Sequence, residues 1–181
     1  HPLAVFSDFF VDTIRGIPML VIILYVGLPL AGAVKSATSG YLDLAMMTRG
    51  ILAIAIGYSA YMAEIFRAGI EAVPKGQIEA ARTLGLRDWQ VARLIVIPQA
   101  IAIVLPALGN EFIAMLKDTS LVSILSVRDL TQRMREFQAQ SFLAFEPFNS
   151  AALIYVFLTI IAASGIKALD NIVNKSRDHE P

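Results

Sequence analysis

The sequence predicts an all-α membrane protein with about four membrane spans, and three observations carry this prediction. The chain of 181 residues is 56% hydrophobic and only 17% charged, whereas soluble domains average roughly 45–50% apolar and about 25% charged residues. Uncharged runs recur along it, each close to the ~20 residues that a helix needs to cross a bilayer. Between the second and third runs lies one polar stretch of high helix propensity, residues 74–98.

The uncharged runs set the predicted spans. In chain order the spans are residues 16–34, 45–72, 94 to about 115, and 147–166. The second span extends beyond its uncharged part, residues 50–63, and includes Glu64 and Arg67. The mildly amphipathic residues 1–15 are expected at the membrane interface, before a first span that has Pro18 and Pro29 near its two ends. Residues 128–146 repeat apolar side chains at helical spacing, which predicts an amphipathic helix on the membrane surface or packed on the bundle. The polar tail, residues 167–181, is expected to fray at its end.

The polar stretch predicts a helix, a glycine turn and a second helix. Pro74 suits the first turn of a helix, where a missing N–H costs nothing. Gly85 can take the left-handed conformation that ends a helix, and Asp88 can cap a second helix from Trp89 onward. Pro98 is then expected to kink or interrupt this helix inside the next apolar run.

Charge distribution predicts the orientation and excludes several functions. Four spans place both termini and residues 74–98 on one side, which holds the larger share of Lys and Arg and is therefore expected to be cytoplasmic. The net charge of zero gives no general basic field for nucleic acid. The chain has no cysteine, and its two histidines, His1 and His179, lie near the termini. Thiol catalysis, disulfides and a histidine metal cluster are thus not expected.

The polar stretch also resembles a known motif. Glu79-Ala80-Ala81, Gly85 and Ile95-Val96-Ile97-Pro98 are similar to the EAA motif of ABC importer permeases. That motif reads EAA, three residues, Gly, nine residues and Ile-x-Leu-Pro, and the one departure is Ile97. The resemblance implies a cytoplasmic coupling helix that docks into a cleft of an ATPase, with contacts from Glu79, Ala80, Ala81, Gly85, Ile95 and Pro98. Spacing alone would favour a solvated charged face, and a DNA-binding helix-turn-helix is disfavoured by the flanking spans.

Most of the chain resembles one branch of this family, the permeases of polar amino acid uptake. The matching segments are RGIP…GLP at 15–18 and 27–29, AEIFRAGI at 63–70, NEF at 110–112 and LKDTSL at 116–121. The resemblance implies a MetI-like transmembrane helical bundle, with residues 1–181 as one domain and 74–98 as its coupling loop. Such permeases usually have five spans, so the first is expected to lie before His1.

The resemblance further implies a transport subunit without catalysis of its own. It would move a polar amino acid, delivered by a solute-binding protein, across the bacterial inner membrane, paired with an identical or related permease subunit. No cofactor is expected on this chain. No Walker motif GxxxxGK[ST] occurs in it, so ATP and magnesium would be used by partner ATPase subunits. The alternatives are a permease for methionine, an osmolyte or an oxyanion, and a membrane scaffold that does not transport.

Polar residues within the spans are the candidates for the substrate path. Ionisable groups there are costly and usually face an interior or a water-filled cavity. If the third span stays helical to Asp118, it offers an acid and a base for the ammonium and carboxylate of an amino acid. Alternatives stay open: Glu64 can pair with Arg67, Lys117 and Asp118 can lie at the interface with Thr119 and Ser120 capping the next segment, and the tyrosines can serve packing. The candidates are Tyr58, Ser59, Tyr61, Glu64, Asn110, Glu111, Lys117 and Asp118.

Overall fold

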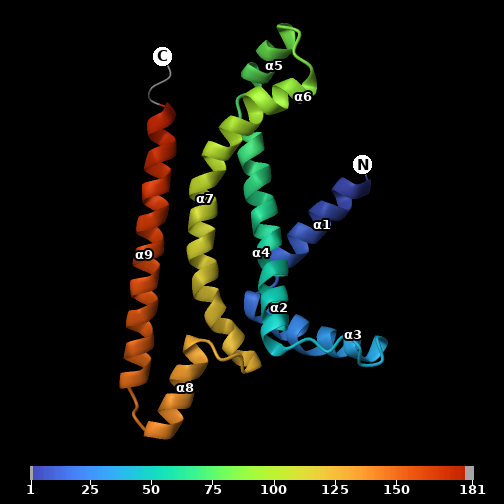
Figure 1. Cartoon of the computed structure of the whole chain (residues 1–181). Helices are drawn as coiled ribbons and strands as arrows, with labels where there is room; N and C mark the ends of the chain where they lie inside the picture. Colours follow the sequence, from blue (N-terminus) through green and yellow to red (C-terminus); the bar gives the residue numbers. More distant parts are fainter. Residues whose placement is uncertain (1, 178–181) are drawn as a thin grey trace. The chain divides into compact units, whose positions relative to one another are not determined.

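The computed structural model describes residues 2–177, and all regular elements in that range are helices (Figure 1). His1, His179 and the predicted frayed end of the tail lie outside the described residues. By its contacts the chain forms two compact units. The first comprises His1–Tyr61 with Ile113–Ile160, and the second comprises Met62–Phe112 with Ile161–Pro181.

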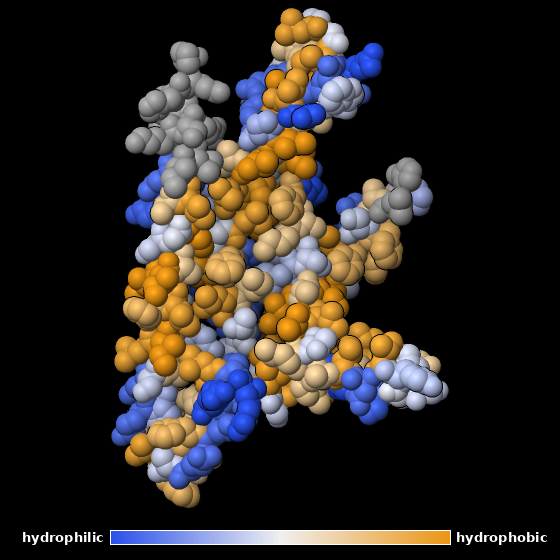
Figure 2. Space-filling view, in the orientation of Figure 1, coloured by the Kyte–Doolittle hydropathy of each residue, from blue (hydrophilic) through white to orange (hydrophobic). Residues whose placement is uncertain are grey.

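Within residues 2–177, four helical segments are long and apolar enough to cross a membrane, which agrees with the predicted fold class and number of spans. They are Met19–Ala37, Met46–Glu71, Asp88–Leu125 and Glu146–Asn171. Figure 2 shows hydrophobic residues along these long helices, whereas hydrophilic residues gather over α8 (Leu130–Ser141) and over the segment that holds α5 (Lys75–Thr83) and α6 (Asp88–Val91). The predicted second span, 45–72, agrees with α4 (Met46–Glu71) to within one residue at each end.

The first span contains a π-helical turn at Pro29. After α1 (Pro2–Gly16), the chain forms α2 (Met19–Tyr25), a π-helical turn Val26–Leu30 and α3 (Ala31–Ala37). Proline has no N–H, and its ring collides with the carbonyl four residues earlier, so a widened turn accommodates it. The expectation that Pro29 lies near the end of the span is wrong, because the helix continues to Ala37.

Pro98 is accommodated in a similar way. A π-helical turn, Ala92–Val96, precedes α7 (Ile97–Asp118), which contains Pro98 near its start. The helical path therefore continues from Asp88 to Leu125 and is not interrupted. It ends in a 3₁₀ helix, Thr119–Leu125, and then reaches α8 and α9 (Glu146–Arg177). The predicted end of the third span near Met115 is thus too early.

The core of the first unit joins the first span to the 3₁₀ helix. Ile22, Ile23 and Val26 pack with Val122 and Leu125, and Ile23 is fully buried. Two glycines, Gly27 and Gly50, give the 3₁₀ helix its close approach; we call them the glycine pair. A Cβ on Gly27 would lie 2.6 Å from Leu125 Cδ1, and one on Gly50 would lie 3.2 Å from Val122 Cγ1.

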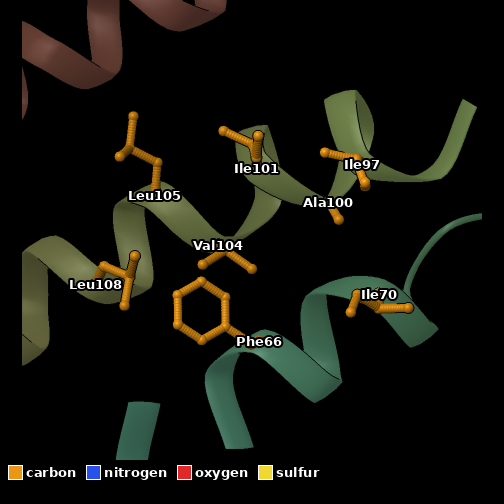
Figure 3. Close-up of a pocket in the computed structure, with 8 residues that line it drawn as sticks. All are labelled: Phe66, Ile70, Ile97, Ala100, Ile101, Val104, Leu105 and Leu108. Carbon is orange, nitrogen blue, oxygen red and sulfur yellow. The ribbon is translucent and has the colours of Figure 1, made fainter. Parts of the chain in front are cut away.

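The second unit contains a close crossing of α4 and α7, and α5 and α6 connect the ends of these two helices (Figure 1). A Cβ on Gly69 would collide with Val104, which is 4% exposed. Beside the crossing lies an apolar cavity of about 280 Å³, into which Phe66 and Val104 point (Figure 3). Its lining residues are Phe66, Ile70, Ile97, Ala100, Ile101, Val104, Leu105 and Leu108.

This crossing predicts a large effect for a small substitution. Gly69→Ala is expected to lower the free energy of unfolding by about 1–3 kcal/mol, because the added methyl group overlaps Val104. Gly165→Ala is the matched control, since Gly165 also lies in a span but has no heavy atom within 4 Å of its Cβ position. Thermal unfolding of the purified variants in detergent measures both. Equal midpoints for Gly69→Ala and Gly165→Ala would contradict the prediction.

Candidate functional site

Tyr58 and Asp118 meet in the first unit although sixty residues separate them in the sequence. Tyr58 lies on α4 and is 5% exposed. Its hydroxyl donates a hydrogen bond to Oδ2 of Asp118, the last residue of α7, with an O–O distance of 2.9 Å. Helix α7 continues to Asp118. This continuation is the requirement under which Asp118 was predicted to contribute an acid to the substrate path.

Tyr61 and Arg15 extend this contact. The rings of Tyr58 and Tyr61 lie 6.0 Å apart between centroids and are tilted by 45°. The Arg15 guanidinium lies 5.8 Å from the centroid of the Tyr61 ring, which is within the range of a cation–π interaction. Arg15, Tyr58, Tyr61 and Asp118 form what we call the tyrosine cluster. It places a cation at one end, a carboxylate at the other and two aromatic rings between them.

Arg15 was missing from the predicted path residues. Its position next to the uncharged run 16–34, within the segment RGIP, marks it as the basic residue at the edge of the first span. The sequence did not indicate that its guanidinium reaches a tyrosine of the second span. The other three members of the cluster were all predicted.

The other polar candidates of the spans do not join the cluster. The Ser59 hydroxyl donates to the Ile56 carbonyl of its own helix at 2.7 Å, a common local bond that needs no ligand. Lys117 is exposed on α7. Asn110, which is exposed, and Glu111, which is half-buried, belong to the second unit. The structure does not support the open alternative in which Thr119 caps the next segment, because its hydroxyl donates back to the Leu116 carbonyl at 2.6 Å.

Glu64 belongs to an ion triad in the second unit. Arg67 donates to both carboxylate oxygens of Glu64, at 2.5 and 3.0 Å, and its Nη1 donates to Glu71 at 2.8 Å. Bidentate pairing of this kind occupies the Glu64 carboxylate. The geometry therefore supports the ion-pair interpretation of Glu64, with Glu71 as a third member that the sequence did not reveal.

The triad predicts an asymmetry between its members. Arg67→Gln is expected to lower the thermal midpoint more than Glu64→Gln, because it leaves two carboxylates on one helix face without their cation. Adding Glu64→Gln to Arg67→Gln should then recover part of the loss. Unfolding midpoints of the three variants in detergent test this, and additive losses would count against it.

Residues 74–98, the coupling segment of the sequence prediction, fold back on themselves. Glu79 and Ala80 are exposed on α5, but Ala81 is only 4% exposed. The prediction that Ala81 offers surface to a partner is wrong, since this side chain packs inside the segment. The Gln99 side chain donates to Gln77 at 2.5 Å and so connects α7 with α5.

The turn and the second helix of the coupling segment lie where they were predicted, but the residue that caps the second helix differs. Gly85 has a φ of +82°, the left-handed region that favours glycine. Asp88 does not cap α6; instead, its carboxylate pairs with Arg82 at 3.0 Å. The N-cap is Arg87, whose backbone N–H donates to the Gln90 side chain at 2.9 Å. Ile95 is half-buried and Pro98 is exposed.

Among residues 2–177, no group of three His, Cys, Asp or Glu side chains is placed to hold a metal ion.

The fold and its spans define a multi-pass helical membrane protein, and comparison with known proteins gives its family. Residues 2–176 match the family described as binding-protein-dependent transport system inner membrane component. The chain belongs to this family. It is therefore a multi-pass, non-catalytic subunit of an ABC transporter, which implies an ATPase and a binding protein as partners.

Several curated relatives are similar over most of the chain. A probable glutamine ABC transporter permease protein of Bacillus subtilis is 37% identical over 177 residues, which cover 97% of this chain and 78% of the relative. An arginine ABC transporter permease protein of Haemophilus influenzae is 34% identical, covering 89% and 73%. The glutamine transport system permease protein of Escherichia coli is 32% identical, covering 89% and 71%.

Two solved structures have the same fold. The crystal structure of an amino acid ABC transporter with histidines is 38% identical, with a TM-score of 0.85 over 94% of this chain and 76% of that chain. An inward-facing MetNI methionine ABC transporter is 17% identical, with a TM-score of 0.75 over 92% and 73%. The second likeness shows the fold alone.

Proposed function

We propose that this chain is the permease of an ATP-driven importer that moves a polar amino acid across the inner membrane. The relatives named for glutamine and arginine support the amino acid class. The observation that carries the proposal is the tyrosine cluster, in which Tyr58 binds Asp118 while Arg15 lies against Tyr61. This arrangement offers separate partners for the two charges of a zwitterion.

In the proposed recognition, each end of the substrate meets one end of the cluster. The ammonium binds the Asp118 carboxylate and faces the rings of Tyr58 and Tyr61, which attract cations. The carboxylate of the substrate pairs with the Arg15 guanidinium. The Tyr58 hydroxyl keeps Asp118 in place until substrate arrives. Such a site recognises the backbone charges shared by amino acids.

Energy would enter through the coupling segment, residues 74–98 of a single transmembrane domain. Exposed Glu79 and Ala80 contact the ATPase, and Gly85 sets the turn that presents α5. Ile95 and Pro98 lie where the coupling segment leads into α7. ATP and magnesium stay on the ATPase, and this chain binds no cofactor. ATP-driven movement of the coupling segment must favour one conformation of the substrate path over another. Binding at the ATPase contact and binding in the substrate path are then linked to each other.

The full complex would contain two permease subunits, either two copies of this chain or a pair of related ones. Reconstitution with the ATPase and the solute-binding protein in liposomes tests the proposal. Uptake and stimulated ATP hydrolysis are measured with polar amino acids, methionine, an osmolyte and an oxyanion. We expect stimulation by a polar amino acid. Stimulation by one of the other solutes alone would overturn the substrate class, and ATPase binding without flux of any solute would indicate a scaffold.

A further inference from the structure

Arg49, near the start of α4, makes three hydrogen bonds that the proposed recognition does not use. Its Nε donates to the Leu44 carbonyl at 2.7 Å, its Nη1 to the Gly27 carbonyl at 3.0 Å and its Nη2 to Asp43 Oδ1 at 3.1 Å. The side chain is only 12% exposed. The guanidinium therefore joins the π-helical turn of the first span to the beginning of the second span within the first unit.

The Gly27 carbonyl accepts this bond because of the π-helical turn Val26–Leu30. Within this turn Pro29 supplies no N–H, and the N–H of Ala31 donates to the carbonyls of Leu28 and Val26. The Ala31 N–H therefore does not donate to the Gly27 carbonyl, and a buried carbonyl needs hydrogen-bond partners. A charged donor at 3.0 Å meets that need from outside the helix.

The same bond fixes the glycine pair. Arg49 is the chain neighbour of Gly50 and is hydrogen-bonded to Gly27. Leu125 and Val122 of the 3₁₀ helix occupy the space that the missing side chains of this pair leave. Both are buried, at 4% and 8% exposed. The position of the 3₁₀ helix therefore depends on the distance between Gly27 and Gly50, which Arg49 spans.

The 3₁₀ helix begins at Thr119, directly after Asp118. We infer that Arg49 is a positioning residue for transport, which holds the glycine pair and, through the 3₁₀ helix, sets the Asp118 carboxylate against Tyr58. The inference rests on the proposed role of Asp118 in the substrate path. Arg49 itself contacts neither substrate nor the tyrosine cluster.

Asp43 supports Arg49 but is less important for this function. Its Oδ2 accepts from Lys35 Nζ at 2.6 Å, and its Oδ1 accepts from Arg49. The Lys35 ammonium, followed by Arg49, holds the pKa of Asp43 below its usual range. At neutral pH Asp43 is therefore a charged, exposed partner of the guanidinium. Removing its charge leaves the bond between Arg49 and the Gly27 carbonyl in place.

Transport by the reconstituted importer tests the inference. Arg49→Gln is expected to lower uptake of the radiolabelled substrate about tenfold or more, the fold-change for loss of one hydrogen bond to a charged group. Arg49→Lys keeps one donor for the Gly27 carbonyl and should recover part of the rate. Asp43→Asn should lose about twofold or less, as expected for an exposed ion pair.

A double variant separates positioning from general damage. If Arg49 acts through Asp118, Arg49→Gln should cause little further loss in the Asp118→Asn background, because the two effects are coupled. If the uptake loss of the double variant equals the product of the two single losses, the Arg49 inference is overturned. The proposed role of Asp118 is not affected by that result. Wild-type uptake by Asp118→Asn overturns the proposed substrate site, and the Arg49 inference with it.

Thiol labelling measures directly how well the 3₁₀ helix is held in its buried position. The chain has no cysteine, so Ser123→Cys introduces one thiol at a position that is 4% exposed, with little change in shape. Maleimide labelling of this thiol in the full complex should be about tenfold faster with Arg49→Gln and unchanged with Asp43→Asn. Equal labelling rates with and without Arg49→Gln would show that Arg49 does not hold this helix, and would overturn the inference.

Discussion

Gly85→Val is expected to lower both ATPase co-purification and substrate uptake by at least about tenfold. The reason is the backbone conformation, because an L residue in the left-handed region costs roughly 1–2 kcal/mol and a β-branched residue costs more. Gly85 N–H donates to the Arg82 carbonyl at 2.9 Å, and Leu86 N–H donates to the Ala81 carbonyl at 3.2 Å. These two bonds form the Schellman motif that ends α5. Valine would break this turn and change how α5 is presented.

The structure provides two controls for this experiment. Gly76→Val adds the same side chain to the same segment, where no positive φ and no neighbouring atom within 4 Å oppose it. Gly85→Asn keeps a residue type that tolerates the left-handed region, so it should lose less than Gly85→Val. Size-exclusion chromatography of the permease with its ATPase, followed by uptake in liposomes, measures the effect. A complex of unchanged stoichiometry and rate with Gly85→Val would contradict the proposed coupling role.

The sequence predicted features that local chemistry determines. The bounds of α4 follow from the polar loop before it and from Pro74 after it, and both ends were placed within one residue. The left-handed Gly85 follows from its place between two helix-forming stretches. The four spans follow from the length of their mainly apolar runs. Each of these features depends on residues that are close together in the chain.

Features that depend on competing partners could not be predicted in the same way. Asp88 is a good N-cap residue, but Arg82 binds its carboxylate, and Gln90 forms the cap with Arg87 instead. Ala81 is buried because the segment folds back on α6 and the following turn. In both cases the outcome depends on a neighbour several residues away, which residue propensity does not include.

The tyrosine cluster contains residues that the sequence predicted and contacts that it could not predict. Tyr58, Tyr61 and Asp118 were selected because polar groups are costly within a span. The pairing of Tyr58 with Asp118 and the approach of Arg15 to Tyr61 join residues far apart in sequence. Such contacts follow from the packing of the first unit, where the glycine pair admits Val122 and Leu125. Without an observed fold, the sequence contains no local signal for them.

Asp118→Asn is expected to lower substrate uptake by about ten- to a hundredfold, mainly through a weaker apparent affinity of the path for its cargo. Asparagine keeps the size of the side chain and can still accept the Tyr58 hydrogen bond, but it lacks the charge that would pair with an ammonium. Tyr58→Phe keeps the ring and loses only the hydroxyl, so its loss should be smaller, about tenfold or less. The order of the two losses distinguishes charge recognition from packing.

Two substitutions in the same unit are matched controls for this pair. Asp129→Asn removes a carboxylate that caps α8 through Gln132 N–H at 2.8 Å, and asparagine caps a helix about as well as aspartate. Tyr155→Phe removes a hydroxyl that is hydrogen-bonded to Thr131 at 3.0 Å. Both should transport at close to the wild-type rate when ATPase and binding protein are held constant. If Asp118→Asn behaves like Asp129→Asn, the Asp118 charge is not used for the substrate. A Tyr58→Phe loss that exceeds the Asp118→Asn loss would instead indicate that the Tyr58 hydroxyl binds substrate directly and that Asp118 only orients it.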